Sequence, residues 1–216
     1  MSALSSAIHD PAVALDLIES ADRFLLQQVF KPIANEYRIS VPSSGSTEEA
    51  RPLFFVKQKK MKIKEDIRFR LDPDADAHLF MIKAKTVFEF RGRHEVHDEH
   101  GRVIGLLEKV FGKSLLRSHW RVRSPEGEPL LEAYESSLVI AIVRRVAELG
   151  PDLFQLLSWL PFNFTLSRGG DEVGTYKRVL GTFRDRYVLE LGPGLEGVDR
   201  RLLVAFTVAL DALQDR

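Results

Sequence analysis

An apolar segment near the C-terminal end, VDRRLLVAFTVALDALQDR at residues 198–216, most constrains what this chain can fold into. Asp199 is a suitable N-cap for a helix, and nearly every residue from Leu202 to Leu213 is apolar, without a polar stripe. A helix that is apolar on all sides has to be buried on all sides. Its most apolar run, residues 202–210, holds nine residues, whereas a membrane-spanning helix needs about 20. We therefore expect no transmembrane span, and a helix surrounded by the rest of the chain.

Most of the remaining sequence consists of short alternating segments separated by turns rich in Gly, Pro, Asp and Ser. Many short strands with polar turns between them indicate an antiparallel sandwich or barrel. A closed sheet is the simplest structure that surrounds the apolar helix on all sides. The candidate strands are EYRISV, PLFFVK, HLFMIK, VFEFR, HEVHD, RVIGLLEKV, LLRSHWRV, PLLEAYESS, FNFTLS, EVGTYKRV and DRYVLEL.

Together these features predict a mainly β fold with a central α-helix. We expect a closed antiparallel barrel around a buried C-terminal helix at residues 199–214. A barrel of about 12 strands is wide enough to need side chains that fill it. The residues expected to fill it, called the plug below, are Leu202, Leu203, Phe206, Leu210 and Leu213.

Two further segments show helical spacing of apolar residues. Asp10-Pro11 is a good helix start, and the spacing that follows predicts an amphipathic helix over residues 11–30. Residues 138–160 predict a helical insertion that either caps one barrel end or forms an exposed apolar patch that contacts a partner or a membrane interface. We expect an N-terminal appendage at residues 1–34 and a barrel domain at residues 35–216. A protein partner would bind residues 11–30 or 138–160.

The order of these segments resembles that of a known family. The resemblance lies in NEYRIS and PLFFVK, in the hairpins of residues 95–134 and 162–180, and in YVLEL followed by the apolar helix. It covers residues 35–213 and is similar to the tubby-like family, which includes tubby C-terminal domains, phospholipid scramblases and plant LURP-one-related proteins. It is closest to the scramblase branch. The resemblance implies a twelve-stranded barrel threaded by its own C-terminal helix, and a role connected with lipids.

The sequence also departs from the animal scramblases. The chain has no cysteine, so the cysteine cluster that carries lipid anchors in those proteins is missing. Their acidic calcium segment corresponds to TFRDRYVLEL at residues 182–191, where Asp185 and Glu190 are the only acidic residues. The resemblance therefore does not imply calcium-triggered, lipid-anchored scrambling, and fold alone does not assign an activity.

The strongest surface signal is a basic segment. Residues 51–70 carry eight basic and two acidic residues, although the formal net charge of the chain is zero. Such a cluster attracts anionic lipid headgroups, but lysines also protect edge strands from aggregation. Nucleic acid is not expected as a partner, because the chain has no excess of positive charge. The candidate lipid-binding residues are Lys57, Lys59, Lys60, Lys62, Lys64, Arg68 and Arg70.

The stretch GPGLEG at residues 192–197 follows a strand and precedes a helix, which is the order of a dinucleotide-binding fingerprint. The helix after it has no polar side that could leave its N-terminus open beside a cofactor. We interpret the glycines as a sharp turn that redirects the chain from the last strand into the barrel. No cofactor is expected.

Two stretches rich in acidic residues or histidine contain the residue types that bind metal ions. In HEVHDEH, His94 and His97 would point to opposite faces of a strand, so we interpret this stretch as a solvated hairpin. In DPDADAH the acidic spacing is that of an EF-hand, but the sixth and twelfth positions hold Ala77 and Lys83 instead of Gly and Glu. No metal is expected.

No set of catalytic residues stands out, so we expect a protein that is not an enzyme. The leading hypothesis is a barrel that binds anionic phospholipid headgroups at the membrane surface. The alternatives are a protein-interaction scaffold without a lipid role and phospholipid scrambling itself. The first residues lack a basic region followed by a long apolar run, so no signal peptide is expected. We expect a cytoplasmic protein with a peripheral position on the inner face of the plasma membrane.

Overall fold

The computed structural model describes residues 8–30, 34–42, 50–59, 66–83, 92–110, 118–135, 163–179 and 186–212. Within these ranges, the side chains of residues 30, 34, 35, 58, 59, 211 and 212 are not described. The helices are α1 (Pro11–Ser20) and α4 (Arg200–Ala212). The strands are β1 (Arg23–Phe30), β2 (Ala34–Pro42), β3 (Ala50–Lys59), β4 (Ile67–Arg70), β5 (Phe80–Ile82), β6 (Arg93–Asp98), β7 (Val103–Val110), β8 (His119–Arg123), β9 (Pro129–Glu135), β10 (Phe164–Arg168), β11 (Asp171–Arg178) and β12 (Arg186–Leu191).

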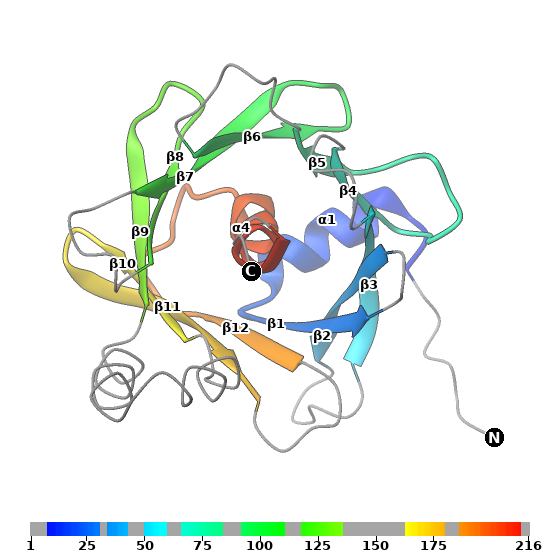
Figure 1. Cartoon of the computed structure of the whole chain (residues 1–216), viewed down its shortest axis with the longest axis horizontal. Helices are drawn as coiled ribbons and strands as arrows, with labels where there is room; N and C mark the ends of the chain where they lie inside the picture. Colours follow the sequence, from blue (N-terminus) through cyan, green and yellow to red (C-terminus); the bar gives the residue numbers. More distant parts are fainter. Residues whose placement is uncertain are drawn as a thin grey trace, which may run out of the picture.

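The strands form a closed barrel in which each strand pairs with its neighbours in the sequence. The barrel closes where β1 pairs antiparallel with β12, with Leu25 opposite Val188. The view down the barrel shows the ring of strands around α4 (Figure 1). The predicted closed antiparallel barrel around a C-terminal helix is therefore confirmed.

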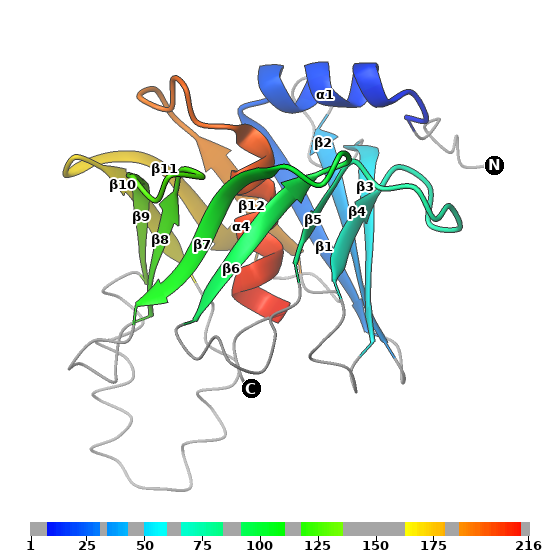
Figure 2. The same cartoon turned by 90° about the horizontal axis from the view of Figure 1, so that it is seen from above.

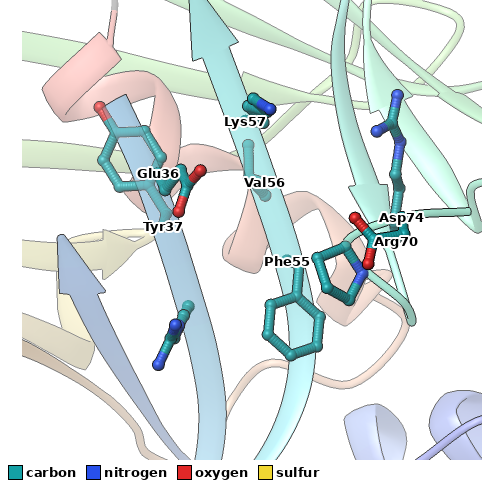
Figure 3. A pocket seen from close by; sticks show the side chains of 9 residues that line it. Glu36, Tyr37, Phe55, Val56, Lys57, Arg70 and Asp74 are labelled. Carbon is teal, nitrogen blue, oxygen red and sulfur yellow. The ribbon is translucent and has the colours of Figure 1, made fainter. Parts of the chain in front are cut away.

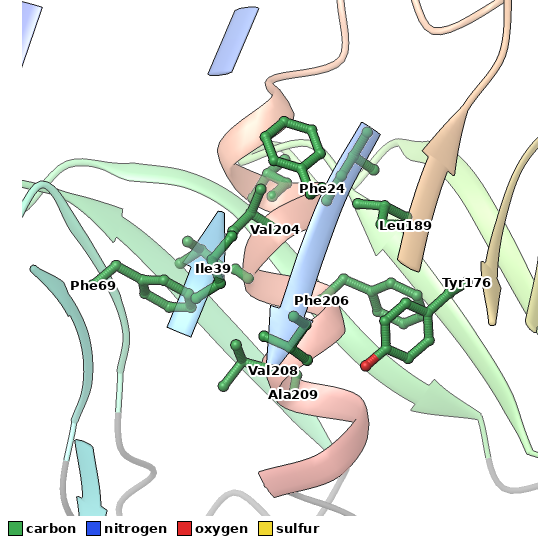
Figure 4. Close-up of a cluster of buried hydrophobic side chains, with 14 of the residues drawn as sticks. Phe24, Ile39, Phe69, Tyr176, Leu189, Val204, Phe206, Val208 and Ala209 are labelled. Carbon is green, nitrogen blue, oxygen red and sulfur yellow. The ribbon is translucent and has the colours of Figure 1, made fainter. Parts of the chain in front are cut away.

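The core of the molecule lies between α4 and the inner faces of the strands. The side chains of Leu202, Leu203, Phe206 and Leu210 are buried, while Leu213 lies outside the described residues. Phe206 makes edge-to-face ring contacts with Trp120 on β8 and Phe164 on β10, at centroid distances of 6.1 and 6.4 Å. Figure 4 shows Phe206 of α4 near Tyr176 and the apolar side chains of the surrounding strands. The four described plug residues occupy the predicted position.

The predicted helix over residues 11–30 is wrong in its second half. α1 ends at Ser20, and residues 23–30 form β1, a full member of the barrel. The predicted boundary between an appendage and the barrel at residue 35 is wrong for the same reason. The spacing of apolar residues fits a helix because Leu25 and Val29 lie on the outer face of a strand whose inner face carries Phe24 and Leu26.

α1 covers one end of the barrel, beside the N-terminal end of α4 (Figure 2). Its N-cap is Asp10, whose Oδ1 accepts a hydrogen bond from the Ala12 N–H at 2.8 Å, as predicted. Arg200 at the start of α4 contacts the Ala21 carbonyl and lies 3.1 Å from the Asp22 carboxylate. These contacts join the two helices at this end of the barrel.

The GPGLEG loop connects β12 to α4 at the same end. Gly194 and Gly197 have φ angles of 90° and 76°, a region that favours glycine. Arg168 holds the loop, because its Nη1 donates hydrogen bonds to the carbonyls of Gly194 and Glu196 at 2.9 and 3.0 Å. Asp199 caps α4 by accepting a hydrogen bond from the Arg201 N–H at 2.9 Å. The loop is a turn into the barrel, as the glycine pattern predicted.

One strand of the barrel was not predicted, and two predicted elements cannot be compared with the structure. The short strand β4 was not among the predicted strands, although Ile67 and Phe69 alternate with two arginines there. The predicted strand VFEFR at residues 87–91 and the predicted insertion at residues 138–160 lie outside the described residues.

Candidate functional site

The outer face of β2, β3 and β4 gathers basic side chains because of how these strands pair. Arg38 on β2 lies opposite Phe55 on β3, and Phe55 lies opposite Arg70 on β4. Two residues away along β2 and β3, Glu36 lies opposite Lys57. The residues between them on each strand are buried apolar residues of the core. The alternation therefore directs all of these side chains to the outside of the barrel.

A pocket of about 300 Å³ lies on this face. Figure 3 shows the side chain of Phe55 between Glu36 on one side and Asp74 on the other. The half-buried Phe55 ring supplies an apolar floor among charged groups. The lining residues are Glu36, Tyr37, Arg38, Phe55, Val56, Lys57, Arg70, Pro73 and Asp74.

Three cationic side chains and two carboxylates line this pocket, so cations are in excess. Arg38 and Lys57 are exposed, whereas Arg70 is half-buried. The Nε atom of Arg70 is buried and has no hydrogen-bond partner within the described part of the chain. A guanidinium group carries its donors in a planar fork that suits phosphate and carboxylate oxygens. The arrangement can bind an anion next to an apolar surface.

His78, in the connection between β4 and β5, reports the positive potential around β4. Burial lowers the pKa of His78 from its ordinary value of 6.5, and the charges of Arg68 and Arg70 lower it further. A cationic imidazole is disfavoured beside two guanidinium groups. A hydrogen bond to the Asp76 backbone and the charge of Asp66 act in the opposite direction.

The predicted basic residues are only partly placed. Lys57, Arg68 and Arg70 lie on the outer face, and two of them, Lys57 and Arg70, line the pocket. The side chain of Lys59 is not described. Lys60, Lys62 and Lys64 lie outside the described residues.

Sequence reasoning missed Arg38 and Phe55 as members of this face. Arg38 is a single basic residue in the strand EYRISV and has no charged cluster beside it in the sequence. It meets Arg70 only through the pairing of β2 with β3 and of β3 with β4. The signal available in the sequence was the alternation of each strand, which assigns Arg38 and Phe55 to outer positions.

The stretches weighed as metal sites form hairpin turns. His97 lies 2.8 Å from the Glu95 carboxylate and 3.0 Å from the Gly101 carbonyl. Asp72 accepts a hydrogen bond from the Asp74 N–H at 2.8 Å, which fixes the turn after β4. Across the ranges that the structure describes, no three His, Asp or Glu side chains are placed to hold one metal ion.

The fold is a twelve-stranded closed barrel with an apolar helix through its centre, and cations are in excess around one pocket on its outer face. A family model described as LURP-one-related matches residues 53–211, well over half of the chain. The chain therefore belongs to the LURP-one-related family. No curated protein matches the sequence significantly.

The family match confirms the resemblance to tubby-like barrels, of which LURP-one-related proteins are relatives. The closer likeness to the scramblase branch stays a prediction. No helix within the described ranges is both long and apolar enough to cross a membrane.

Proposed function

We propose that this protein binds anionic phospholipid at the surface of a membrane through the outer face of β2, β3 and β4, and that it acts by binding and not by catalysis. The observation that carries the proposal is the convergence of Arg38, Lys57 and Arg70 around Phe55. These residues come from three strands, and the barrel holds their backbones in fixed positions.

The chemistry of this face suits a lipid headgroup. Each basic residue near an anionic membrane contributes about 1 kcal/mol of attraction, so three cations raise surface affinity substantially. Arg38 and Arg70 offer planar donor groups for phosphate oxygens. Phe55 offers an apolar ring that can rest among the glycerol and upper acyl groups beside the headgroup. Glu36 and Asp74 lower the net positive charge of this face. Salt screens the attraction between the cations and the anionic headgroups, so we expect binding to weaken as the salt concentration rises.

Flotation of the full chain with lipid vesicles tests the proposal. We expect binding to vesicles that contain phosphatidylserine in a phosphatidylcholine background, little binding to phosphatidylcholine alone, and release at high salt. Lys57→Glu and Arg70→Glu should each reduce the bound fraction several-fold. Lys177→Glu is the matched control for Lys57→Glu, because Lys177 is also an exposed strand lysine but lies on β11.

Binding that ignores salt, or equal binding by Lys57→Glu and the control, would contradict the proposal. A third variant combines Lys59→Glu, Lys60→Glu and Lys62→Glu. It measures how much the predicted lysines at the end of β3 and just after it in the sequence contribute to vesicle binding. Retained melting behaviour in each variant shows that lost binding is not lost folding.

A further inference from the structure

A second pocket, of about 460 Å³, lies on the outer face of β12, β1, β2 and β3. It shares only Arg38 with the pocket of the candidate site. Its described lining residues include three arginines and no acidic residue, which distinguishes it from the first pocket. The lining residues are Arg23, Leu25, Leu26, Gln27, Arg38, Ser40, Ala50, Pro52, Val179, Arg186 and Val188.

The register of the strands sorts these side chains into two parallel rows. In one row, Gln27 on β1 lies between Arg186 on β12 and Arg38 on β2. Neighbouring strands are about 4.8 Å apart, so the backbones of the two arginines are about 10 Å apart, within reach of a shared small anion. This row consists entirely of hydrogen-bond donors apart from the Gln27 carbonyl.

The second row lies two residues further along each strand and is largely apolar. Leu25 lies opposite Val188 on one side and Ser40 on the other, and Ser40 lies opposite Pro52. Val179, at the rim, keeps 37% of its surface exposed. An exposed apolar rim beside a row of donors is suited to a molecule that has an anionic end and a hydrocarbon body.

Several hydrogen-bond donors of the first row lack a protein partner within the described ranges. Within the described ranges, Arg38 and Arg186 have no ion-pair partner, whereas Arg23 lies 3.5 Å from Glu190. The Nε2 atom of Gln27 is buried and has no hydrogen-bond partner there. Buried donors are almost always paired, so the unpaired amide between two guanidinium groups indicates that an acceptor binds at this place.

We propose that this pocket binds an anionic amphiphile, with its carboxylate or phosphate group held by Arg38, Arg186 and the Gln27 amide and its hydrocarbon chain along Leu25, Val188 and Pro52. The proposal does not depend on the membrane-binding function, since only Arg38 belongs to both surfaces. The same chemistry occurs in a free fatty acid and in an anionic membrane lipid, so the test separates the two sources.

Calorimetric titration of the full chain with decanoate and with decyl phosphate, below their micelle concentrations, tests the site. We expect saturable binding with one ligand per chain. Arg186→Gln and Arg38→Gln should each weaken it at least tenfold, and decanol, which has the same chain without the charge, should bind at least tenfold more weakly. Arg93→Gln, at an exposed arginine on β6 that lines neither pocket, is the matched control and should leave the affinity unchanged.

Absence of saturable binding, equal affinity for decanol, or unchanged affinity in both Arg186→Gln and Arg38→Gln would overturn the proposal. Vesicle flotation of Arg186→Gln then identifies the source of a ligand that does bind. Reduced flotation assigns the site to a membrane lipid, and unchanged flotation assigns it to a free amphiphile. Because Lys57→Glu tests membrane binding alone, failure of either proposal can be recognised without the other.

Discussion

Gly105 on β7 lies directly against Leu202 on α4. A Cβ atom at position 105 would fall 2.6 Å from Cδ1 of Leu202 and 2.7 Å from the carbonyl oxygen of Arg123. A glycine inside a strand often marks the close approach of another segment. Here the glycine allows the helix to pack against the barrel wall at β7.

We expect Gly105→Ala to lower the free energy of unfolding by about 1–3 kcal/mol, because overpacking forces neighbouring side chains and backbone to move. Urea denaturation measures the change. In the double variant with Leu202→Ala, the total loss should be smaller than the sum of the two single losses, since the alanine removes one of the clashing groups. Additive losses would show that the two residues do not meet.

Phe206→Ala should lower the free energy of unfolding by about 3–5 kcal/mol, since it empties the centre of a buried aromatic cluster. Phe206→Asp should cost more, because it places a carboxylate without a partner in the barrel interior. Thermal melting followed by circular dichroism checks both. Val13→Ala, at a site that is 44% exposed on α1, serves as the control, with an expected change within about 0.5 kcal/mol. A normal melting curve for Phe206→Asp would rule out the central helix.

Asp98 should make the fold sensitive to acid. Burial by itself raises the pKa of Asp98, but hydrogen bonds from the backbone N–H groups of Arg102 and His100 and from the Arg102 side chain outweigh it, and the pKa is lowered from 3.8. A carboxylate with a depressed folded-state pKa stabilises the fold above its unfolded pKa, and this stabilisation disappears as the pH falls through the folded pKa.

We therefore expect stability to decline as the pH falls below about 4. Asp98→Asn should lower the free energy of unfolding by about 1–3 kcal/mol at neutral pH and should flatten the decline in acid. Denaturation curves between pH 2 and pH 7 make the comparison. Glu172→Gln, at an exposed carboxylate on β11, should retain the wild-type profile. An equally steep profile in Asp98→Asn would exclude Asp98 as its source.

The GPGLEG loop offers a matched pair of glycines. Gly197 has a φ of 76°, and no neighbouring atom lies within 4 Å of the position that a Cβ atom would take there. Gly192 has an ordinary φ, and a Cβ atom there would meet only the Val173 carbonyl group, at 3.4 Å from its oxygen. Gly197→Ala should cost about 1–2 kcal/mol through backbone strain alone, and Gly192→Ala should be nearly neutral. Chemical denaturation of the two variants, side by side, gives the difference. Equal losses would mean that the turn does not need its left-handed residue.

The outline of the barrel could be predicted from the sequence because its elements carry strong local patterns. The helix at residues 202–210 is apolar on all sides and therefore has to be buried, and apolar and polar residues alternate clearly in most strands. β1 could not be recognised in this way. Its outer face carries Leu25 beside a pocket, and its inner face carries the buried Gln28, so apolar residues fall at spacings that fit a helix.

The candidate site was less accessible to prediction because it is made by strand register. The basic segment was visible, since Lys57, Arg68 and Arg70 are close in the sequence. Arg38 lies in a separate segment and reaches the same surface as Arg70 only through the pairing of β2 with β3 and of β3 with β4. A one-residue shift in that pairing would send each of them to the opposite face.

The closure of β1 on β12 joins segments from opposite ends of the described chain. A ribosome delivers the N-terminal residues first, so β1 is made long before its second partner exists. The inner faces of all twelve strands likewise remain without their core until α4 is synthesised. Distant pairings of this kind slow folding. Here the apolar inner faces of the strands are buried only when α4 packs between them, so α4 completes the core of the barrel.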